Sequence, residues 1–383
     1  MVAIQKSTLG ITRLFQRVGS GDVLFVTNGV GDSALYRTEN IAEELNLHGF
    51  CARVTVQDNP FLLKYSDRFS VFVFHRVVFT KKIESLMGIL SNKGKTLIFE
   101  TDDLVYDPQY FCQTEAYHNM GSAEKALYAE GLGGEILKNA SVRACTTTTT
   151  YLAEKLKERG KRVFLVPNRL SQKDVHIAKE ICEKSFHPAI HNSQASTPTT
   201  NITVGYFSGT ASHNKDFATI SAALQKIFRK YENVTLLVVG PLKLDEDLKE
   251  FSDRIVQKPY TPREKHFQNV ASIDINLAPL EICNPFCESK SELKFFEAGI
   301  VGVPTIASAT RTFQEAITDG VDGFVAQTTE EWIKKLSQLI ENKDLREKMG
   351  ELAYKKTMRD YTTENAHNDE YYSYLRDCIQ HEA

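Results

Sequence analysis

The stretch that decides the fold is SIDINLAPLEICNPFCESKSELKFFEAGIVGVPTIAS, residues 272–308. Its apolar runs Ile273–Leu277 and Thr305–Ala307 are predicted to be buried strands. The segment Glu292–Ile300 between them is predicted to be a helix, and Pro304 prevents that helix from continuing. A strand, a helix and a second strand in this order indicate one βαβ unit of a parallel sheet.

The same alternation of apolar runs and amphipathic segments extends outward over most of the chain. Further predicted strands are Val23–Thr27, Cys51–Val56, Val71–Phe74, Thr96–Glu100, Val142–Thr146, Arg162–Val166, Ile202–Phe207, Val234–Val239, Ile255–Val256 and Gly323–Val325. The predicted helices are 36–47, Lys81–Leu90, Thr150–Arg159, Phe217–Lys230, Pro262–Ala271, Glu330–Glu341 and Leu345–Tyr354. The pattern predicts an α/β fold of two doubly wound, Rossmann-like domains, in which ligands bind beyond the carboxyl ends of the strands.

A polar stretch, SFHPAIHNSQASTPTTN at residues 185–201, separates the two alternating series. It is rich in Pro, Ser and Thr and has no periodicity, which is typical of a linker or a surface insertion. We therefore predict an N-terminal domain at 1–185, a linker at 186–201, a C-terminal domain at 202–357 and a helical tail at 358–383.

Composition and charge exclude several classes of protein. The 383 residues are 42% apolar and 25% charged, which rules out low-complexity disorder and collagen. A net charge of -3 gives no footprint for nucleic acid. The seven scattered cysteines lack zinc-finger spacing, so we expect no metal and reduced thiols in the cytoplasm. The mildly basic N-terminal half is compatible with a peripheral contact at the inner face of a membrane.

The start of the predicted helix 292–300 carries the strongest candidate site. Ser291 is predicted to cap this helix, which leaves backbone N–H groups near Leu293 for a diphosphate. Lys290, Lys294 and Glu297 share one helical stripe, so the lysines reach phosphate and the carboxylate reaches ribose hydroxyls. The alternative is an ordinary cap followed by an exposed ion pair of Lys294 with Glu297.

Two loops of the C-terminal half are candidates to complete this site. The first follows the strand 202–207, where the backbone amides of Ser208–Thr210 can approach a ligand closely because Gly209 has no side chain. His213 and Lys215 follow in the same loop and can add positive charge. In the second loop, Tyr260 can stack on a nucleobase, although tyrosines at strand ends more often cover the core.

In the N-terminal half, two loops that follow predicted strands are candidates for contact with a ligand. Gly29 and Gly31 lie in the loop after the first strand, but the full dinucleotide-binding fingerprint is absent. Asp102 and Asp103 follow the strand 96–100, where they contact hydroxyls of the acceptor or the sugar, or are two solvated acids of a turn. His75 also faces the cleft or has a structural role.

The string S-x-L-K-x-x-E-A-G-x-x-G-V-P-T-I-A-S at residues 291–308 resembles the nucleotide-sugar site of family-4-type glycosyltransferases, glycosyl transferases group 1, with the GT-B fold. The continuation FQEAITDGVDGFV at residues 313–325 is similar to the segment that follows in these enzymes. The resemblance implies two Rossmann-like domains that face a central cleft. It also implies a reaction without metal that retains the anomeric configuration, and a C-terminal helix that packs back toward the N-terminal domain.

The resemblance also implies residue roles. Glu297 is the ribose ligand, the turn Ser291–Lys294 holds the diphosphate, and Lys215 stabilises the departing nucleoside diphosphate. The chain departs from the family at two positions. Ser289 stands where many members have a second glutamate, and Gly209 stands where many have an arginine. His213 or Lys290 is the candidate replacement for that arginine, and Asp103 is the third candidate catalytic residue, beside Lys215 and His213.

The expected function is transfer of a hexose from a nucleotide sugar to a hydroxyl of a glycan or lipid-linked acceptor, in bacterial surface polysaccharide synthesis. The donor is a co-substrate and no other cofactor is expected. Two alternatives remain: a non-catalytic sugar- or nucleotide-binding module with this fold, and a sugar-nucleotide epimerase. Several bases, sugars and acceptors are compatible with this pattern, and dTDP-rhamnose is one candidate donor.

Overall fold

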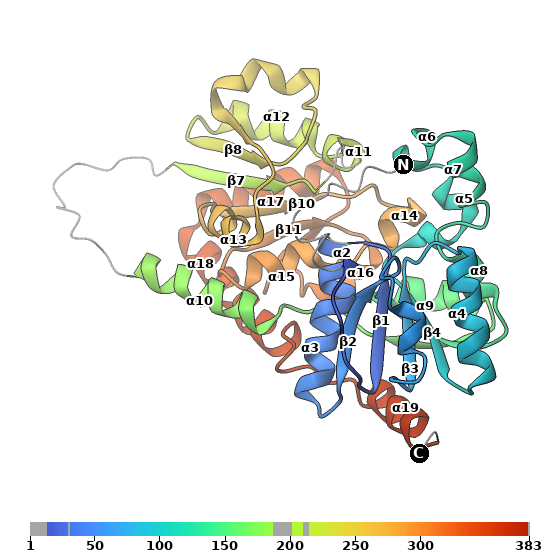
Figure 1. Cartoon of the computed structure of the whole chain (residues 1–383). Coiled ribbons are helices and arrows are strands. Elements are labelled where there is room, and N and C mark those ends of the chain that lie inside the picture. The colour runs from blue at the N-terminus through green and yellow to red at the C-terminus, as the bar shows by residue number, and fades with distance from the viewer. Residues whose placement is uncertain (1–13, 30, 187–200, 210–213, 382–383) are drawn as a thin grey trace. The chain divides into compact units, whose positions relative to one another are not determined.

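The computed structural model describes residues 14–29, 31–186, 201–209 and 214–381 (Figure 1). The chain divides into two compact units. Unit 1 is Met1–Ser171 with Ser289–Ser291 and Ala366–Ala383, and unit 2 is Gln172–Glu288 with Glu292–Asn365. The predicted α/β class, with two doubly wound parallel sheets, is confirmed. No helix within the described ranges is long and apolar enough to cross a bilayer.

Unit 1 contains a sheet of six parallel strands in the order β2-β1-β3-β4-β5-β6. The strands are β1 Val23–Thr27, β2 Ala52–Val56, β3 Val71–His75, β4 Thr96–Thr101, β5 Val142–Thr147 and β6 Arg162–Leu165. Every residue of β1 and β3 is buried, which explains why their sequences are continuous apolar runs rather than alternating ones. β2 pairs with one edge of β1, and β3 pairs with the other edge. The order of the strands therefore reverses between β1 and β3, which border the switch point of the topology.

The helices of unit 1 are mostly short. They are α2 Asp32–Ala34, η1 Leu35–Glu39, α3 Asn40–Leu47, η2 Leu62–Tyr65, α4 Lys81–Asn92, η3 Leu104–Tyr106, α5 Pro108–Phe111, α6 Glu115–His118, α7 Ser122–Ala126, α8 Gly134–Lys138, α9 Thr150–Lys157 and α19 Asp369–Gln380. The helix predicted at 36–47 starts as a π-helical turn, η1, and continues as α3. The helices between 104 and 138 were not predicted, since each spans only three to five residues.

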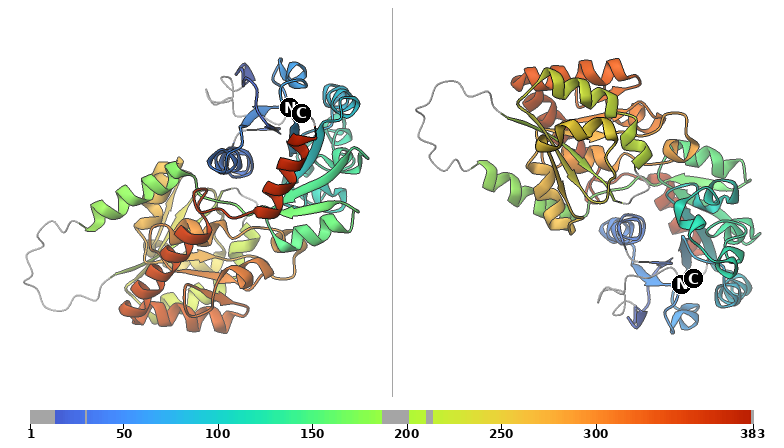
Figure 2. Two further views of the ribbon diagram at one scale, coloured as in Figure 1. Left: turned by 90° about the horizontal axis from the view of Figure 1, so that it is seen from below. Right: turned by 90° about the horizontal axis from the view of Figure 1, so that it is seen from above.

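The C-terminal helix α19 lies against the sheet of unit 1 (Figures 1 and 2). Tyr371, Tyr372 and Leu375 are buried in the same apolar cluster as residues of β1 and β3. The hydroxyl of Tyr372 donates a hydrogen bond of 2.6 Å to Oε1 of Glu44 on α3. Helix α19 therefore completes an apolar core that β1 and β3 begin.

A buried ion pair joins η1, the turn that directly precedes α3, to the sheet of unit 1. Arg37 is fully buried, and its Nε and NH2 donate to the two carboxylate oxygens of Glu100 at 2.7 and 2.9 Å. Its NH1 donates to the carbonyl of Val166 at 2.7 Å and to Asn168 at 3.0 Å. Bidentate geometry and further acceptors are what a buried guanidinium requires, so Arg37 holds η1, β4 and the end of β6 together.

Unit 2 contains a second sheet of six parallel strands in the order β12-β11-β10-β7-β8-β9. The strands are β7 Ile202–Phe207, β8 Val234–Val239, β9 Ile255–Lys258, β10 Ile275–Ala278, β11 Thr305–Ser308 and β12 Phe324–Ala326. The chain builds outward from β7 to β9 on one side and from β10 to β12 on the other. This is the classic order of a Rossmann sheet, with the switch point between β7 and β10.

The helices of unit 2 are α10 Gln172–Phe186, α11 Asn214–Ala218, α12 Ser221–Lys230, η5 Glu246–Arg254, α13 Arg263–Ala271, α14 Pro285–Glu288, α15 Leu293–Gly299, α16 Arg311–Ala316, α17 Thr329–Glu341 and α18 Lys343–Asp360. The single helix predicted at Phe217–Lys230 is wrong, because the chain breaks between α11 and α12. The hydroxyl of Thr219 donates to the carbonyl of Asp216 at 2.6 Å, a local bond that competes with continued helix.

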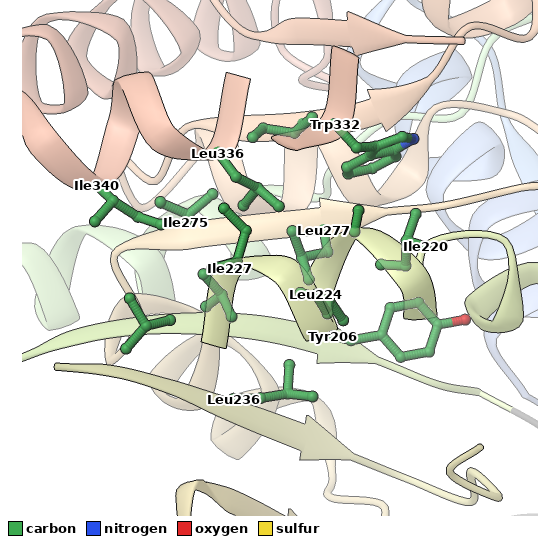
Figure 3. Close-up of a cluster of buried hydrophobic side chains, with 14 of the residues drawn as sticks. Tyr206, Ile220, Leu224, Ile227, Leu236, Ile275, Leu277, Trp332, Leu336 and Ile340 are labelled. Carbon is green, nitrogen blue, oxygen red and sulfur yellow. The ribbon is translucent and has the colours of Figure 1, made fainter. Parts of the chain in front are cut away.

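Helices α12 and α17 cover the sheet of unit 2 with apolar side chains. Figure 3 shows their residues pointing toward those of β7, β8 and β10. The labelled residues are Tyr206, Ile220, Leu224, Ile227, Leu236, Ile275, Leu277, Trp332, Leu336 and Ile340. This core fixes the strands whose carboxyl ends carry the candidate site.

Candidate functional site

The loop after β7 packs tightly against the loop after β8. The hydroxyl of Ser208 donates to the carbonyl of Pro241 at 2.8 Å. Gly240 has φ +100°, and a Cβ there would lie 1.9 Å from the carbonyl oxygen of Ser208. Gly209 differs, because a Cβ there would meet no described atom within 4 Å. No described atom would therefore obstruct a ligand at Gly209, and Thr210 and His213 lie outside the described residues.

Lys215 and Asp216 follow at the start of α11. Lys215 is exposed, and Asp216 is buried. Oδ1 of Asp216 accepts bonds from the thiol of Cys287 at 3.2 Å and from the backbone N–H of Glu281 at 3.4 Å. Asp216 therefore connects the segment after β7 with the segment after β10, the two loops that border the switch point.

Asp216, Glu281 and Cys287 also form the one group in the described ranges whose side chains could hold an ion together. Asp216 and Cys287 already bond to each other there, with the thiol as donor. The structure gives no test of the expected metal-independence, which stays a prediction.

Helix α15 carries Lys294 and Glu297, but it begins later than predicted. Its first residue is Leu293, and Glu292 occupies the N-cap without a side-chain cap bond. The prediction that Ser291 caps the helix is therefore wrong. Its hydroxyl instead accepts a bond of 2.8 Å from the amide of Asn168. Lys290 belongs to the same short segment, Ser289–Ser291, which groups with unit 1.

Two contacts, one with β10 and one with α18, fix the position of α15. The amide of Asn276 on β10 donates to the carbonyl of Lys294 at 2.8 Å. At the other end of the helix, a Cβ on Gly299 would lie 2.3 Å from the hydroxyl oxygen of Thr357 on α18. Gly299 is thus required for the close approach of α15 and α18, which sets the height of the helix over the sheet.

Lys294 brings a positive charge to the end of β7. Its ammonium donates a hydrogen bond of 2.5 Å to the carbonyl of Phe207, the last residue of that strand. The same nitrogen lies 5.3 Å from the ring centroid of Tyr206, a cation–π distance. The amine is therefore anchored within the loop region where the sequence predicts the diphosphate.

Glu297 is bonded to two basic side chains of α13. NH1 of Arg263 donates to Oε1 at 3.2 Å, and Nε2 of His266 lies 3.2 Å from Oε2. The ring of His266 in turn packs edge-on against Phe207 at 5.3 Å between centroids. Lys294 and Glu297 are thus linked to the same residue of β7, one directly and one through His266. Arg263 and His266 were not predicted as site residues.

Tyr260 follows β9, and 56% of its surface is exposed. At this exposure the side chain of Tyr260 does not cover the core.

Leu293, whose backbone N–H region was predicted to face the diphosphate, is the first residue of α15.

The predicted acids of unit 1 are partly buried and belong to a polar network, so they are not simply solvated. Nε of Arg76 donates to Asp102 at 2.7 Å, and NH2 donates to Asp103 at 2.5 Å. Burial opposes the charge on Asp102, yet Arg76, His75 and Ser33 together hold the pKa of this carboxyl below its usual range. Burial and the neighbouring charge of Asp102 raise the pKa of Asp103.

Histidine and hydroxyl groups extend this network to the other strands at the switch point of unit 1. The hydroxyl of Ser33 donates to Asp102 at 2.7 Å and lies 3.1 Å from Nε2 of His75. Nδ1 of His75 lies 3.0 Å from the hydroxyl of Thr27 at the end of β1. The network therefore gathers side chains that follow or end β1, β3 and β4. The sequence pattern gave no signal for Ser33 or Arg76.

Gly29 and Gly31 border this network on either side of residue 30, which lies outside the described residues. A Cβ on either glycine would meet nothing within 4 Å among the described atoms. The loop after β1 is therefore open at these two positions.

Comparison with known proteins gives the same architecture. HepE from Anabaena, crystallised with UDP, is 15% identical with a TM-score of 0.59, over 93% of this chain and 100% of that one. Sucrose-phosphate synthase from Thermosynechococcus elongatus is 13% identical with a TM-score of 0.60, over 94% and 100%. A glycosyltransferase from Rickettsia africae is 11% identical with a TM-score of 0.60, over 94% and 99%. No curated protein matches the chain in sequence.

The two Rossmann-like sheets and these structural matches define the GT-B fold of glycosyltransferases. Residues 188–356 match the family model of glycosyl transferases group 1, so this part of the chain is similar to the domain that the model describes. The predicted resemblance and the predicted class of enzyme are both confirmed at this level. The matched range contains β7–β12 and hence Lys215, Lys294 and Glu297.

Proposed function

We propose that the protein transfers a hexosyl group from a nucleotide sugar to a hydroxyl of a glycan or lipid-linked acceptor. The observation that carries the proposal is the placement of Lys294 and Glu297 around Phe207. Lys294 contacts the end of β7 directly, and Glu297, one helical turn further on, is linked to the same residue through His266. A diphosphate and a ribose are a matched pair of ligands for such groups.

The donor side of the reaction needs positive charge where the leaving diphosphate becomes more negative. As the anomeric C–O bond breaks, Lys294 and Lys215 stabilise this charge, together with the backbone amide of Gly209. The predicted amide of Ser208 does not contribute, because it donates to the carbonyl of Val239 at 2.8 Å. The family's usual arginine is replaced by Gly209, which leaves room for a phosphate at its open face. The fixed amine of Lys294 supplies the missing charge.

Glu297 accepts hydrogen bonds from the ribose hydroxyls in this proposal. A carboxylate has about four acceptor positions, so one that is held by Arg263 and His266 still accepts bonds from a sugar. Tyr260 stacks on the base from the loop after β9. The UDP and UDP-glucose complexes of HepE make uracil the first base to test.

Asp102 and Asp103 serve the acceptor or the transferred sugar in this proposal. Arg76 and Ser33 fix the two carboxylates at the carboxyl edge of the sheet of unit 1. Hydroxyl groups of a sugar are donors that fit such fixed acceptors. Gly29 and Gly31 leave the neighbouring loop open for a bulky ring.

The finer features of the proposal follow the family. The reaction retains the anomeric configuration, uses neither metal nor further cofactor, and contributes to surface polysaccharide synthesis in the cytoplasm. The acceptor is bound at, or near, the inner face of the membrane. The excess of basic residues in the N-terminal half supports a peripheral contact there.

The test is a panel of UDP-, GDP- and dTDP-sugars, with released nucleoside diphosphate measured in the presence of simple glycan acceptors. Release that depends on wild-type protein and falls in the variant Lys294→Met supports transfer. Binding of donors without any release favours the non-catalytic module. Conversion of one nucleotide sugar into its epimer, without release, favours the epimerase.

A further inference from the structure

The side chain of Glu297 is held from two sides by one helix. Arg263 and His266 stand three positions apart on α13, so both point to the same flank. Each contacts a different oxygen of the carboxylate, at 3.2 Å in both cases. An ionised carboxylate can only accept hydrogen bonds, so Arg263 donates to Oε1, and the tautomer of His266 that carries its hydrogen on Nε2 can donate to Oε2.

Arg263 is itself fixed by a second acid. Its Nε and NH2 donate to the two oxygens of Asp174 on α10 at 2.6 and 3.1 Å. The side chain of Asp174 is 3% exposed, and the guanidinium lies 5.1 Å from the ring centroid of Phe267. Bidentate pairing and ring contact leave a guanidinium little freedom, so NH1 points at Glu297 in a defined direction.

His266 is fixed by rings. Its imidazole lies edge-on to Phe207 at 5.3 Å and to Phe267 at 5.6 Å between centroids. Only 20% of its side chain is exposed. The imidazole is therefore placed between the end of β7 and the carboxylate of Glu297 by packing.

We propose that Arg263 and His266 are positioning residues for Glu297, and that Asp174 anchors Arg263. The inference rests on the proposed role of Glu297 in binding ribose. A glutamate loses much rotamer freedom when it accepts hydrogen bonds from two hydroxyls. The array of Arg263, His266 and Asp174 removes that freedom before the nucleotide arrives. Misplacement of such a group by a fraction of an ångström is enough to weaken its contacts.

The array predicts a property that general stability does not affect: discrimination for the ribose hydroxyls. Affinities are measured by calorimetry for UDP, GDP, ADP and dTDP, and for the 2′,3′-dideoxy form of the tightest of them. The ratio of the two dissociation constants reports the hydroxyl contacts alone. We expect wild-type protein to favour the natural diphosphate by about tenfold or more, and Glu297→Gln to remove this preference.

Arg263→Met keeps the apolar stem of the side chain and loses the guanidinium, and His266→Phe keeps the ring and loses Nε2. Each is expected to reduce the ratio by about threefold or more, and Asp174→Asn to reduce it less. Lys265→Met is the matched control, because Lys265 is an exposed cation on the same helix. It is expected to leave the ratio unchanged.

A double-variant cycle separates positioning from direct contact with the ligand. If Arg263 acts through Glu297, Arg263→Met has no further effect on the ratio in the Glu297→Gln background. An unchanged ratio in folded Arg263→Met, or additive effects in the double variant, overturns the inference. A wild-type protein that binds none of the diphosphates, or that binds natural and dideoxy forms equally, overturns instead the proposed function of the site.

Discussion

The ammonium of Lys294 and the carbonyl of Phe207 are joined by a hydrogen bond of 2.5 Å. This bond connects α15 to the last residue of β7, and a second one connects α15 to Asn276 on β10. The helix therefore bridges the two strands between which the topology of the sheet reverses. In the proposed site, a lysine that is held in this position loses little further entropy when it binds a phosphate.

The variant Lys294→Met removes the charge and keeps most of the side-chain volume. We expect the affinity for nucleoside diphosphates to fall about 10- to 100-fold, because a hydrogen bond to a charged group contributes about 1.5–3 kcal/mol. Calorimetry measures the loss. Lys334→Met is the control, since Lys334 is an exposed lysine on α17 of the same unit. Equal affinities for wild-type protein and a folded Lys294→Met would remove Lys294 from the proposed site.

Substitution by alanine should have different effects at two glycines of adjacent loops, Gly240 after β8 and Gly209 after β7. A methyl group at Gly240 would collide with the carbonyl of Ser208 and occupy a backbone with positive φ. Gly240→Ala is therefore expected to destabilise unit 2 by about 1–3 kcal/mol. Urea unfolding followed by Trp332, the single tryptophan and a residue of unit 2, measures this loss.

Gly209→Ala is expected to leave that stability unchanged, because its Cβ would enter open space. It should instead weaken diphosphate binding, since a methyl group stands where the proposed phosphate meets the backbone. If Gly209→Ala binds nucleoside diphosphates as tightly as wild-type protein does, the loop after β7 does not form the phosphate contact.

The local part of this structure could be predicted from the sequence, and the long-range part could not. Strands such as Val23–Thr27 were predicted correctly because apolar β-branched runs depend on neighbouring residues alone. Glu297 was identified by a motif within one segment. Its partner Arg263 lies 34 positions away, and the anchor Asp174 lies 89 positions before Arg263. Nothing in one sequence indicates such pairs. The predicted cap at Ser291 failed because its hydroxyl bonds to Asn168, 123 positions away.

Arg37 is expected to be the most stability-critical charge of unit 1. Arg37→Met leaves the carboxylate of Glu100 buried without its bidentate partner, which costs about 3–5 kcal/mol in comparable cases. Far-UV circular dichroism during urea unfolding measures the change, while Trp332 fluorescence reports unit 2. The double variant Arg37→Met with Glu100→Gln should recover part of the loss, because no buried charge remains unpaired. A loss below about 1 kcal/mol in Arg37→Met would show that the pair contributes little to the fold.

The pKa shifts of Asp102 and Asp103 predict that neutralising Asp102 lowers the free energy of unfolding more than neutralising Asp103 does. The pKa of Asp102 is lowered from 3.8 by Arg76, His75 and Ser33 despite burial, so its ionised form stabilises the folded state. That stabilisation is complete above the unfolded value of about 3.9 and decreases as the pH falls from there toward the folded pKa. Asp102→Asn should therefore lower the free energy of unfolding by about 1–3 kcal/mol at pH 7 and pH 5, and by less below about pH 4. The pKa of Asp103 is raised by burial and by Asp102, so its charge is disfavoured and Asp103→Asn should cost less at neutral pH. Urea titrations of the three proteins across this pH range measure the differences. An equal cost for both variants at pH 7, or a cost for Asp102→Asn that does not decrease as the pH falls below about 4, would contradict the assignment of the stabilising charge to Asp102.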